Sequence, residues 1–206
     1  MGPVIINYGM GNLRSVSNAC EALGRPAKIA TDPGDLRDAE RIILPGVGAF
    51  GDAMTNLAAS GWVEVLENEV RRKGKFFLGL CLGMQVLAAT GTEFGIHAGL
   101  GWIDGTVVRL ETGDPALRIP HMGWNSVTVA RKDGLLAGIG ESPVFYFVHS
   151  YVLQPADPSV VTAHCTYGVA FAAVVECGNI QATQFHPEKS HEAGLTVLKN
   201  FLSRRA

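Results

Sequence analysis

A cysteine flanked by two glycines stands out in residues 76–85, FFLGLCLGMQ. The apolar residues before Cys81 have the length of a strand buried on both faces of a parallel sheet, and residues 82–87 predict a short apolar helix. Glycines two positions before and after the cysteine are typical of a nucleophile elbow, a tight strand-to-helix turn that lifts one side chain above the sheet. A helix N-terminus would favour the Cys81 thiolate, and the N–H of Leu82 would point to a developing oxyanion. The alternative is a buried structural cysteine between two packing glycines.

A second reactive pattern, His186-Pro187-Glu188, lies between a predicted strand and the last predicted helix. Pro187 favours an extended backbone at His186, and residues two apart in an extended segment project to the same side. Glu188 can therefore reach one imidazole nitrogen while the other faces outward. Cysteine nucleophiles need a base beside the thiol and an acid that fixes the tautomer of that base. Alone, His-Pro-Glu is commonly a surface turn; with the elbow it predicts a triad of Cys81, His186 and Glu188.

The segment 45–51, PGVGAFG, follows a predicted strand and contains three glycines. Its peptide groups can reorient at low cost. A phosphate-binding loop would usually carry a lysine near its end, and this one does not. We therefore expect it to present backbone N–H groups to a small anionic centre, with a plain glycine-rich turn as the alternative. His121 and His149 lie in aromatic-rich segments and are predicted to be structural. The other histidines, His97, His164 and His191, are assigned to the surface or the core.

Strand-like and helix-like segments alternate over residues 4–87, which predicts parallel βαβ units. The second half is rich in strand-like segments separated by Gly, Pro and Asp. Together they predict an α/β fold with three layers and a mainly parallel open sheet to which antiparallel strands are added, in a single domain over residues 1–206. The later segments are strands at 106–110, 127–129, 144–148, 160–163, 170–175 and 180–185, a hairpin turn at 177–179 and a helix at 191–203.

The composition narrows the class of protein. The chain has 206 residues, is 47% hydrophobic and 17% charged, and carries a formal net charge of −2, which gives no reason to expect nucleic acid or a membrane surface as a partner. No apolar run approaches the roughly 20 residues needed to span a bilayer, and the N-terminus lacks the basic flank of a signal peptide. Four scattered cysteines predict neither a disulfide framework nor a zinc site. We expect a cytoplasmic protein without a metal.

The elbow residues 79–85 together with the late His186-Pro187-Glu188 resemble the class I (triad) glutamine amidotransferases over essentially the whole chain. The resemblance implies hydrolysis of glutamine through a γ-glutamyl thioester on Cys81, with no cofactor. His186 would act as the base and Glu188 would orient it. The resemblance also implies that N–H groups of Leu82 and of the Gly46-Val47 loop hold the oxyanion. The residues that would bind glutamine are Gly48, Gln85, Glu93, Ser150 and Tyr151.

Four further segments resemble the glutaminase subunits of imidazole glycerol phosphate synthases: 7–12 (NYGMGN), 120–125 (PHMGWN), 146–151 (YFVHSY) and Lys189-Ser190. The implied partner is a separate cyclase subunit, a (β/α)8 barrel in a heterodimer, which uses the ammonia in histidine biosynthesis. Asn12, Trp124 and Tyr146 would lie at the cyclase interface, near the ammonia passage. For Trp124, packing in the core is the competing interpretation.

Two other functions remain open at this stage. One is a different hydrolase with a cysteine, histidine and acid, such as a peptidase or a γ-glutamyl hydrolase. The other is a non-catalytic regulatory subunit that keeps the elbow, in which Cys81 would be no more reactive than Cys20, Cys165 or Cys177. The leading hypothesis includes weak activity of the chain alone, because the glycine loop can leave one oxyanion donor turned away until the partner binds.

Overall fold

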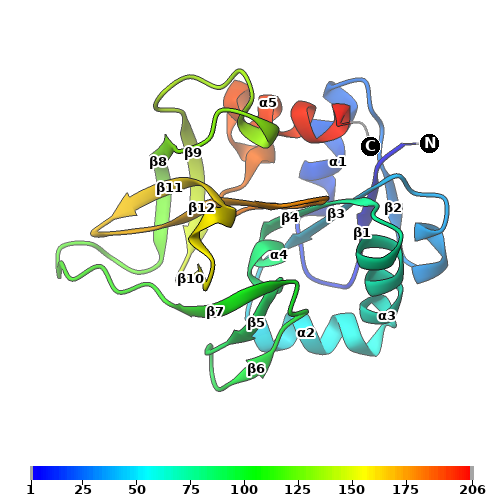
Figure 1. The fold of residues 1–206 in the computed structure, drawn as a ribbon, viewed down its shortest axis with the longest axis horizontal. Coiled ribbons are helices and arrows are strands. Elements are labelled where there is room, and N and C mark those ends of the chain that lie inside the picture. Colours follow the sequence, from blue (N-terminus) through cyan, green and yellow to red (C-terminus); the bar gives the residue numbers. More distant parts are fainter. Residues whose placement is uncertain (1, 205–206) are drawn as a thin grey trace.

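The computed structural model describes residues 2–204 and is organised around a nine-stranded sheet (Figure 1). Its order is β2-β1-β3-β4-β13-β12-β11-β8-β9. The first five strands in this order are parallel to one another, and the remaining four are added in antiparallel pairings, which confirms the predicted α/β class. The strands are β1 (Val4–Ile6), β2 (Lys28–Ala30), β3 (Arg41–Gly46), β4 (Phe76–Cys81), β8 (His121–Val129), β9 (Val144–His149), β11 (Val161–Tyr167), β12 (Val169–Cys177) and β13 (Ile180–Thr183).

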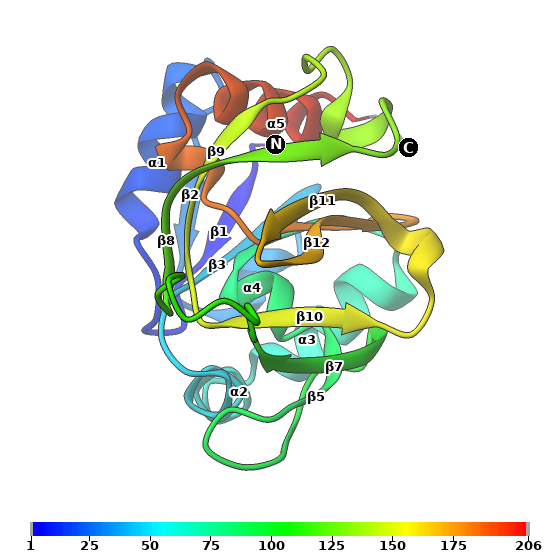
Figure 2. The same ribbon diagram turned by 90° about the vertical axis from the view of Figure 1, so that its left-hand side faces the viewer.

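Helices cover both faces of the parallel part of this sheet (Figures 1 and 2). Successive side chains of a strand point to opposite faces, so each strand contributes side chains to a hydrophobic core on each face of the sheet. Ile5, Ile43 and Leu78 pack on one side with α1 (Leu13–Ala22) and α5 (His191–Ser203). Ile6, Ile42 and Phe77 pack on the other with α2 (Phe50–Ala59) and α3 (Trp62–Leu66). The three layers follow from this alternation.

Shorter helical segments complete the fold. A π-helical segment, Glu67–Arg72, extends α3, and 3-10 turns cover Pro33–Leu36, Gly134–Leu136, Pro158–Val160 and Pro187–Lys189.

A separate four-stranded sheet, in the order β10-β7-β5-β6, was not predicted. Its strands are β5 (Ala88–Gly91), β6 (His97–Ala98), β7 (Ile103–Arg109) and β10 (Tyr151–Pro155). The expectation that residues 106–110 join the main sheet is therefore wrong. The physical reason is one-sided burial: Ile103 and Val107 are buried, whereas Asp104 is exposed, which suits a strand on the flank of the domain. The chain enters this sheet directly from β9, because only Ser150 separates β9 from β10.

Two local predictions have different outcomes. The helix after Cys81 is shorter than predicted: α4 covers only Leu82–Gln85, because Leu87 accepts the backbone N–H groups of residues 102 and 103 and leads into β5. The hairpin turn is confirmed, since Cys177 pairs with Ile180 across a two-residue loop and Gly178 has φ +60°. Among residues 2–204, no helix has the length and apolar character to cross a bilayer.

Candidate active site

Cys81 occupies a strained turn between β4 and α4. Its φ of 54° and ψ of −105° lie in a region that non-glycine residues rarely adopt. The flanking glycines allow the turn because backbone segments meet there. A Cβ on Gly79 would lie 2.7 Å from the carbonyl carbon of Gly83, and a Cβ on Gly83 would collide with the carbonyl group of Leu44. The predicted need for glycine on both sides of the cysteine is confirmed.

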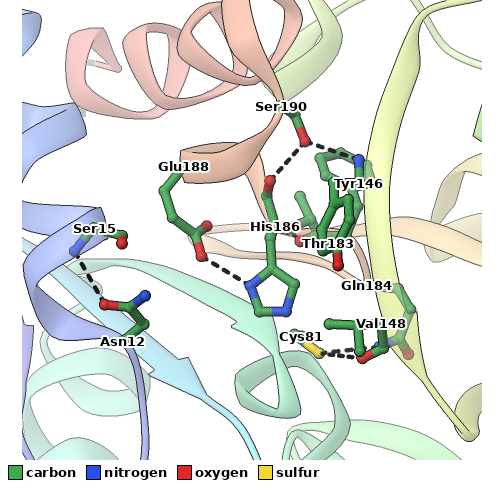
Figure 3. A network of polar contacts seen from close by, with 11 residues as sticks. Asn12, Ser15, Cys81, Tyr146, Val148, Thr183, Gln184, His186, Glu188 and Ser190 are labelled. Atoms are coloured by element: carbon green, nitrogen blue, oxygen red, sulfur yellow. Dashed lines mark hydrogen bonds and ion pairs between the residues drawn. The ribbon is translucent and has the colours of Figure 1, made fainter. Parts of the chain in front are cut away.

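His186 and Glu188 form a buried pair beside this turn (Figure 3). His186 has the extended backbone expected before Pro187, and its Nδ1 lies 2.8 Å from Oε1 of Glu188. Ser190, which the sequence analysis named only as part of a resembling segment, ties this segment to β9. The hydroxyl of Ser190 donates to the carbonyl of His186 at 2.6 Å and accepts the backbone N–H of Tyr146 at 3.0 Å.

The second imidazole nitrogen of His186, Nε2, is directed toward Cys81 (Figure 3). Burial by itself lowers the pKa of His186. The neighbouring Cys81 and the hydrogen-bonded carboxylate of Glu188 outweigh burial and raise the pKa to about 9, although Nε2 of His186 has no hydrogen-bond partner among the described residues. An imidazole held between a thiol and a carboxylate can accept the thiol proton and keep it as a stabilised imidazolium.

A cavity of about 360 Å³ opens above Cys81. This volume lies within the range of small-molecule sites. All five residues that the resemblance assigned to glutamine line it, and so do two of the three oxyanion residues, Val47 and Leu82. Gly46 does not line the cavity; it is paired in register with Cys81, and a Cβ there would lie 2.8 Å from Cβ of Leu82. The lining residues are Val47, Gly48, Cys81, Leu82, Gln85, Glu93, Pro120, Val148, His149, Ser150 and Tyr151.

Hydrogen bonds fix the walls of the cavity. Gln85 donates from Nε2 to the carbonyl of Tyr151 at 2.8 Å and to Oε1 of Gln184 at 3.2 Å. Glu93 accepts the backbone N–H of Phe50, the first residue of α2, at 2.9 Å. Helix α2 therefore holds the carboxylate at the edge of the cavity.

Two groups next to the sulfur were not predicted. Gln184 donates from Nε2 to Sγ of Cys81 at 3.7 Å, and Sγ lies 3.8 Å from the carbonyl of Val148 (Figure 3). Gln184 precedes His186 by two residues, so the same alternation that places Glu188 with His186 could have identified it. Val148 contacts the sulfur through its backbone carbonyl, and since every residue has one, the residue type could not have predicted this contact.

The three residues expected at the partner interface are at least partly accessible. Trp124 is 49% exposed, stacks on His191 at 4.8 Å and meets the ring of Tyr146 at 5.9 Å, so core packing of Trp124 is ruled out. The side chain of Asn12 is the N-cap of α1 and accepts the N–H of Ser15. His121 and His149 are buried and hydrogen-bonded to each other, as predicted for structural histidines.

Comparisons with known proteins agree with this geometry. The family profile described as "Glutamine amidotransferase class-I" matches residues 4–204. A structure of PurLQS from Thermotoga maritima superimposes with a TM-score of 0.75 at 21% identity, covering 97% of this chain and 96% of that chain, which supports the fold. The chain therefore belongs to the class I glutamine amidotransferase family.

Relatives of higher identity narrow the assignment. "Imidazole glycerol phosphate synthase subunit HisH" of Geobacter sulfurreducens is 48% identical over 201 residues, covering 96% of both chains. The subunit of the same name from Rhodopirellula baltica is 49% identical over 198 residues, covering 96% of this chain and 95% of the relative. Within the class I family the chain belongs with these HisH subunits, and the resemblance stated from its motifs is confirmed.

Proposed function

We propose that this chain is the glutaminase subunit of imidazole glycerol phosphate synthase, with Cys81, His186 and Glu188 as its catalytic triad. It hydrolyses L-glutamine to glutamate and ammonia as one glutaminase domain over residues 1–206. The observation that carries the proposal is a strained cysteine that lines a cavity of small-molecule size, with a buried histidine–glutamate pair whose second imidazole nitrogen is directed toward that cysteine.

The first half of the reaction forms the thioester. His186 takes the thiol proton of Cys81, and the sulfur attacks the side-chain carbonyl carbon of glutamine. The negative charge that develops on the oxygen is held by backbone N–H groups of Leu82 and of the Gly46-Val47 loop. His186 then gives its proton to the leaving nitrogen, the carbon–nitrogen bond breaks, and ammonia departs from a γ-glutamyl thioester.

The second half restores the enzyme. A water molecule loses a proton to His186 and attacks the thioester carbonyl, and the same N–H groups hold the second oxyanion. The carbon–sulfur bond breaks, His186 returns its proton to the sulfur, and glutamate leaves. Glu188, 2.8 Å from Nδ1, keeps the imidazole oriented and stabilises its charge in both halves. Gly48, Gln85, Glu93, Ser150 and Tyr151 hold the substrate in the cavity.

The ammonia acceptor lies on the cyclase subunit, which forms a heterodimer with this chain. Asn12, Trp124 and Tyr146 contribute to the interface and to the ammonia passage. The exposed indole of Trp124, supported from behind by His191 and Tyr146, has the character of an interface anchor. The cyclase uses the ammonia to make imidazole glycerol phosphate and aminoimidazole carboxamide ribotide. We place the complex in the cytoplasm, where the free cysteines of this chain remain reduced.

The test is glutamate release from glutamine by the chain alone and then with the cyclase subunit and its nucleotide ligand. Cys81→Ala is compared with Cys177→Ala, which changes an exposed free cysteine. We expect turnover that rises strongly with the liganded partner, disappears in Cys81→Ala and persists in Cys177→Ala. Turnover that survives in Cys81→Ala would overturn the assignment of the nucleophile, and stimulation only by a different synthase would overturn the choice of partner.

A further inference from the structure

The carbonyl oxygen of Tyr151 accepts two side-chain hydrogen bonds at the wall of the cavity. Gln85 donates to it from Nε2 at 2.8 Å, and the imidazole of His149 bonds to it through Nδ1 at 3.0 Å. On the far side of His149, Nε2 lies 3.0 Å from Nδ1 of His121. The nucleophile is reached from Gln85 through Gln184. A continuous set of hydrogen bonds thus runs from Asn125 through His121 and the Tyr151 carbonyl to Cys81.

A backbone carbonyl can only accept, so Tyr151 determines where the protons in this set lie. His149 must carry its proton on Nδ1, which makes Nε2 an acceptor. His121 must then donate from Nδ1, and its own Nε2 accepts the amide of Asn125 at 3.2 Å. Asn125 confirms the direction from the other end, since its Nδ2 donates to the carbonyl of Thr166 and its Oδ1 accepts the N–H of Ser126.

The same carbonyl also orients the amide of Gln85. One hydrogen of Nε2 goes to Tyr151 and the other goes to Gln184. Both hydrogens are used inside the protein, so Oε1 is the amide atom that remains for a ligand in the cavity. Gln85 therefore offers an acceptor, which suits an N–H group of glutamine.

The two histidines are held in place by rings and by burial. His121 is 2% exposed and stacks on the rings of Tyr167, at 4.1 Å, and Phe147, at 4.9 Å, with interplanar angles of 26° and 27°. His149 meets Phe171 at 5.0 Å. Burial lowers the pKa of His121 to about 4. Burial, the facing His121, and His186 lower the pKa of His149 to about 3, although its bond to Tyr151 acts in the opposite direction. Both imidazoles are therefore neutral at physiological pH, as the proton arrangement requires.

We propose that His121 and His149 are positioning residues for glutamine: they hold the Tyr151 carbonyl, and through it the Gln85 amide, in the orientation that binds the substrate. This inference rests on the proposed function of the cavity. His149 also lines the cavity, and no hydrogen bond joins either histidine to Cys81 or His186 among the described residues. The set begins on β8 at Asn125, next to the exposed Trp124, so it also joins the proposed partner face to the substrate cavity.

The test measures modification of Cys81 in the full chain with the cyclase subunit and its nucleotide ligand. One reagent is the chloromethyl ketone analogue of glutamine, which must occupy the cavity; the other is iodoacetamide, which is small and needs no glutamine site. The variants are His149→Phe, which removes the donor, and His149→Asn, whose Nδ2 takes the place of the ring Nδ1. His164→Phe changes an exposed histidine of β11 and is the matched control.

We expect His149→Phe to need about tenfold more analogue for half-maximal modification rate, the effect of one buried hydrogen bond. Its rate with iodoacetamide stays within about twofold of wild type. His149→Asn recovers most of the loss, and His164→Phe behaves as wild type. His121→Phe keeps a stacked ring but removes the donor to His149. We expect it also to raise the analogue concentration needed for half-maximal modification rate. This variant keeps the proposal testable if His149→Phe does not fold.

Equal analogue affinity in wild type, His149→Phe and His121→Phe would overturn the positioning role while leaving the proposed function intact. A parallel loss with both reagents, not recovered by His149→Asn, would also overturn it, because it would indicate general damage to the fold. A wild-type chain that reacts with iodoacetamide and never with the analogue would refute the proposed function, and this inference with it.

Discussion

The carboxylate of Glu188 can be removed with little change in shape by Glu188→Gln. It lies 2.8 Å from Nδ1 of His186, and the two side chains are only 2% and 4% exposed. The variant keeps the volume of the side chain and removes its charge. The amide can turn either its oxygen or its NH2 toward Nδ1, so the imidazole loses both a fixed tautomer and a stabilised protonated form.

The size of the effect follows from the pKa of His186. Burial lowers it, and Cys81 and Glu188 raise it to about 9. Loss of an opposite charge at this distance lowers a pKa by about 1–3 units, which is roughly 1.4–4 kcal/mol of lost imidazolium stabilisation. Removal of the carboxylate from a comparable triad costs about 10⁴ in kcat, and we expect a fall of about 10³-fold for Glu188→Gln.

A pH dependence of stability follows as well. The folded-state pKa of His186 is raised from 6.5 to about 9. The corresponding stabilisation, about 3 kcal/mol, is fully present below pH 6.5 and is lost as the pH rises through 9. Wild-type chain should therefore lose unfolding free energy across this window, and Glu188→Gln should lose much less, because the pKa of its His186 is closer to the unfolded value.

The assays are glutamate release with the liganded cyclase subunit, and urea unfolding at pH 6 and pH 9.5. Glu192→Gln, an exposed residue in the first turn of α5, makes the same chemical change away from the site and should match wild type in both assays. The reasoning is refuted if Glu188→Gln keeps more than about a tenth of wild-type turnover, or if its unfolding free energy falls with pH as steeply as that of wild type.

Three further changes test other parts of the site. Val47→Pro removes one proposed oxyanion N–H and should lower partner-stimulated turnover about 10²–10³-fold with unchanged cyclase affinity; normal stimulation would exclude Val47 as the donor. Gly83→Ala should cost about 3 kcal/mol or more in urea unfolding, because its Cβ meets the Leu44 carbonyl, whereas Gly140→Ala, with open space around it, should change little. Trp124→Ala should weaken cyclase binding about tenfold by titration calorimetry and leave turnover of the isolated chain unchanged; unaltered binding would remove Trp124 from the interface.

The elbow and the histidine–glutamate pair were predictable because their geometry is local. Gly79 and Gly83 lie within two residues of Cys81. A Cβ at Gly79 would clash with the turn itself, and a Cβ at Gly83 would clash with the adjacent β3. His186 and Glu188 are brought together by backbone alternation across a single proline. In both cases the residue types record a conformation that a few neighbouring residues determine.

The second sheet was not predictable in the same way. β5 and β6 contain four and two residues, and their pairing depends on partners far along the chain: β7 is held by β10, more than forty residues later. Long-range hydrogen bonds also explain the short length of α4, because the carbonyl of Leu87 accepts the N–H groups of residues 102 and 103. Long-range hydrogen bonding overrides a local apolar pattern that favours a longer helix.

The division between predicted and missed parts of the site has a chemical basis. The groups that react are side chains, and cysteine, histidine and glutamate are recognisable by type. The groups that orient them are largely backbone carbonyls: Val148 beside the sulfur, and Tyr151 beside Gln85 and His149. Any residue can supply a carbonyl, so the residue type at Val148 near the end of β9 and at Tyr151 at the start of β10 does not reveal these contacts, although both residues line the cavity. His121 and His149 have the buried, hydrogen-bonded character predicted for structural histidines, and the positioning role proposed for them depends on the Tyr151 carbonyl, which residue types do not reveal.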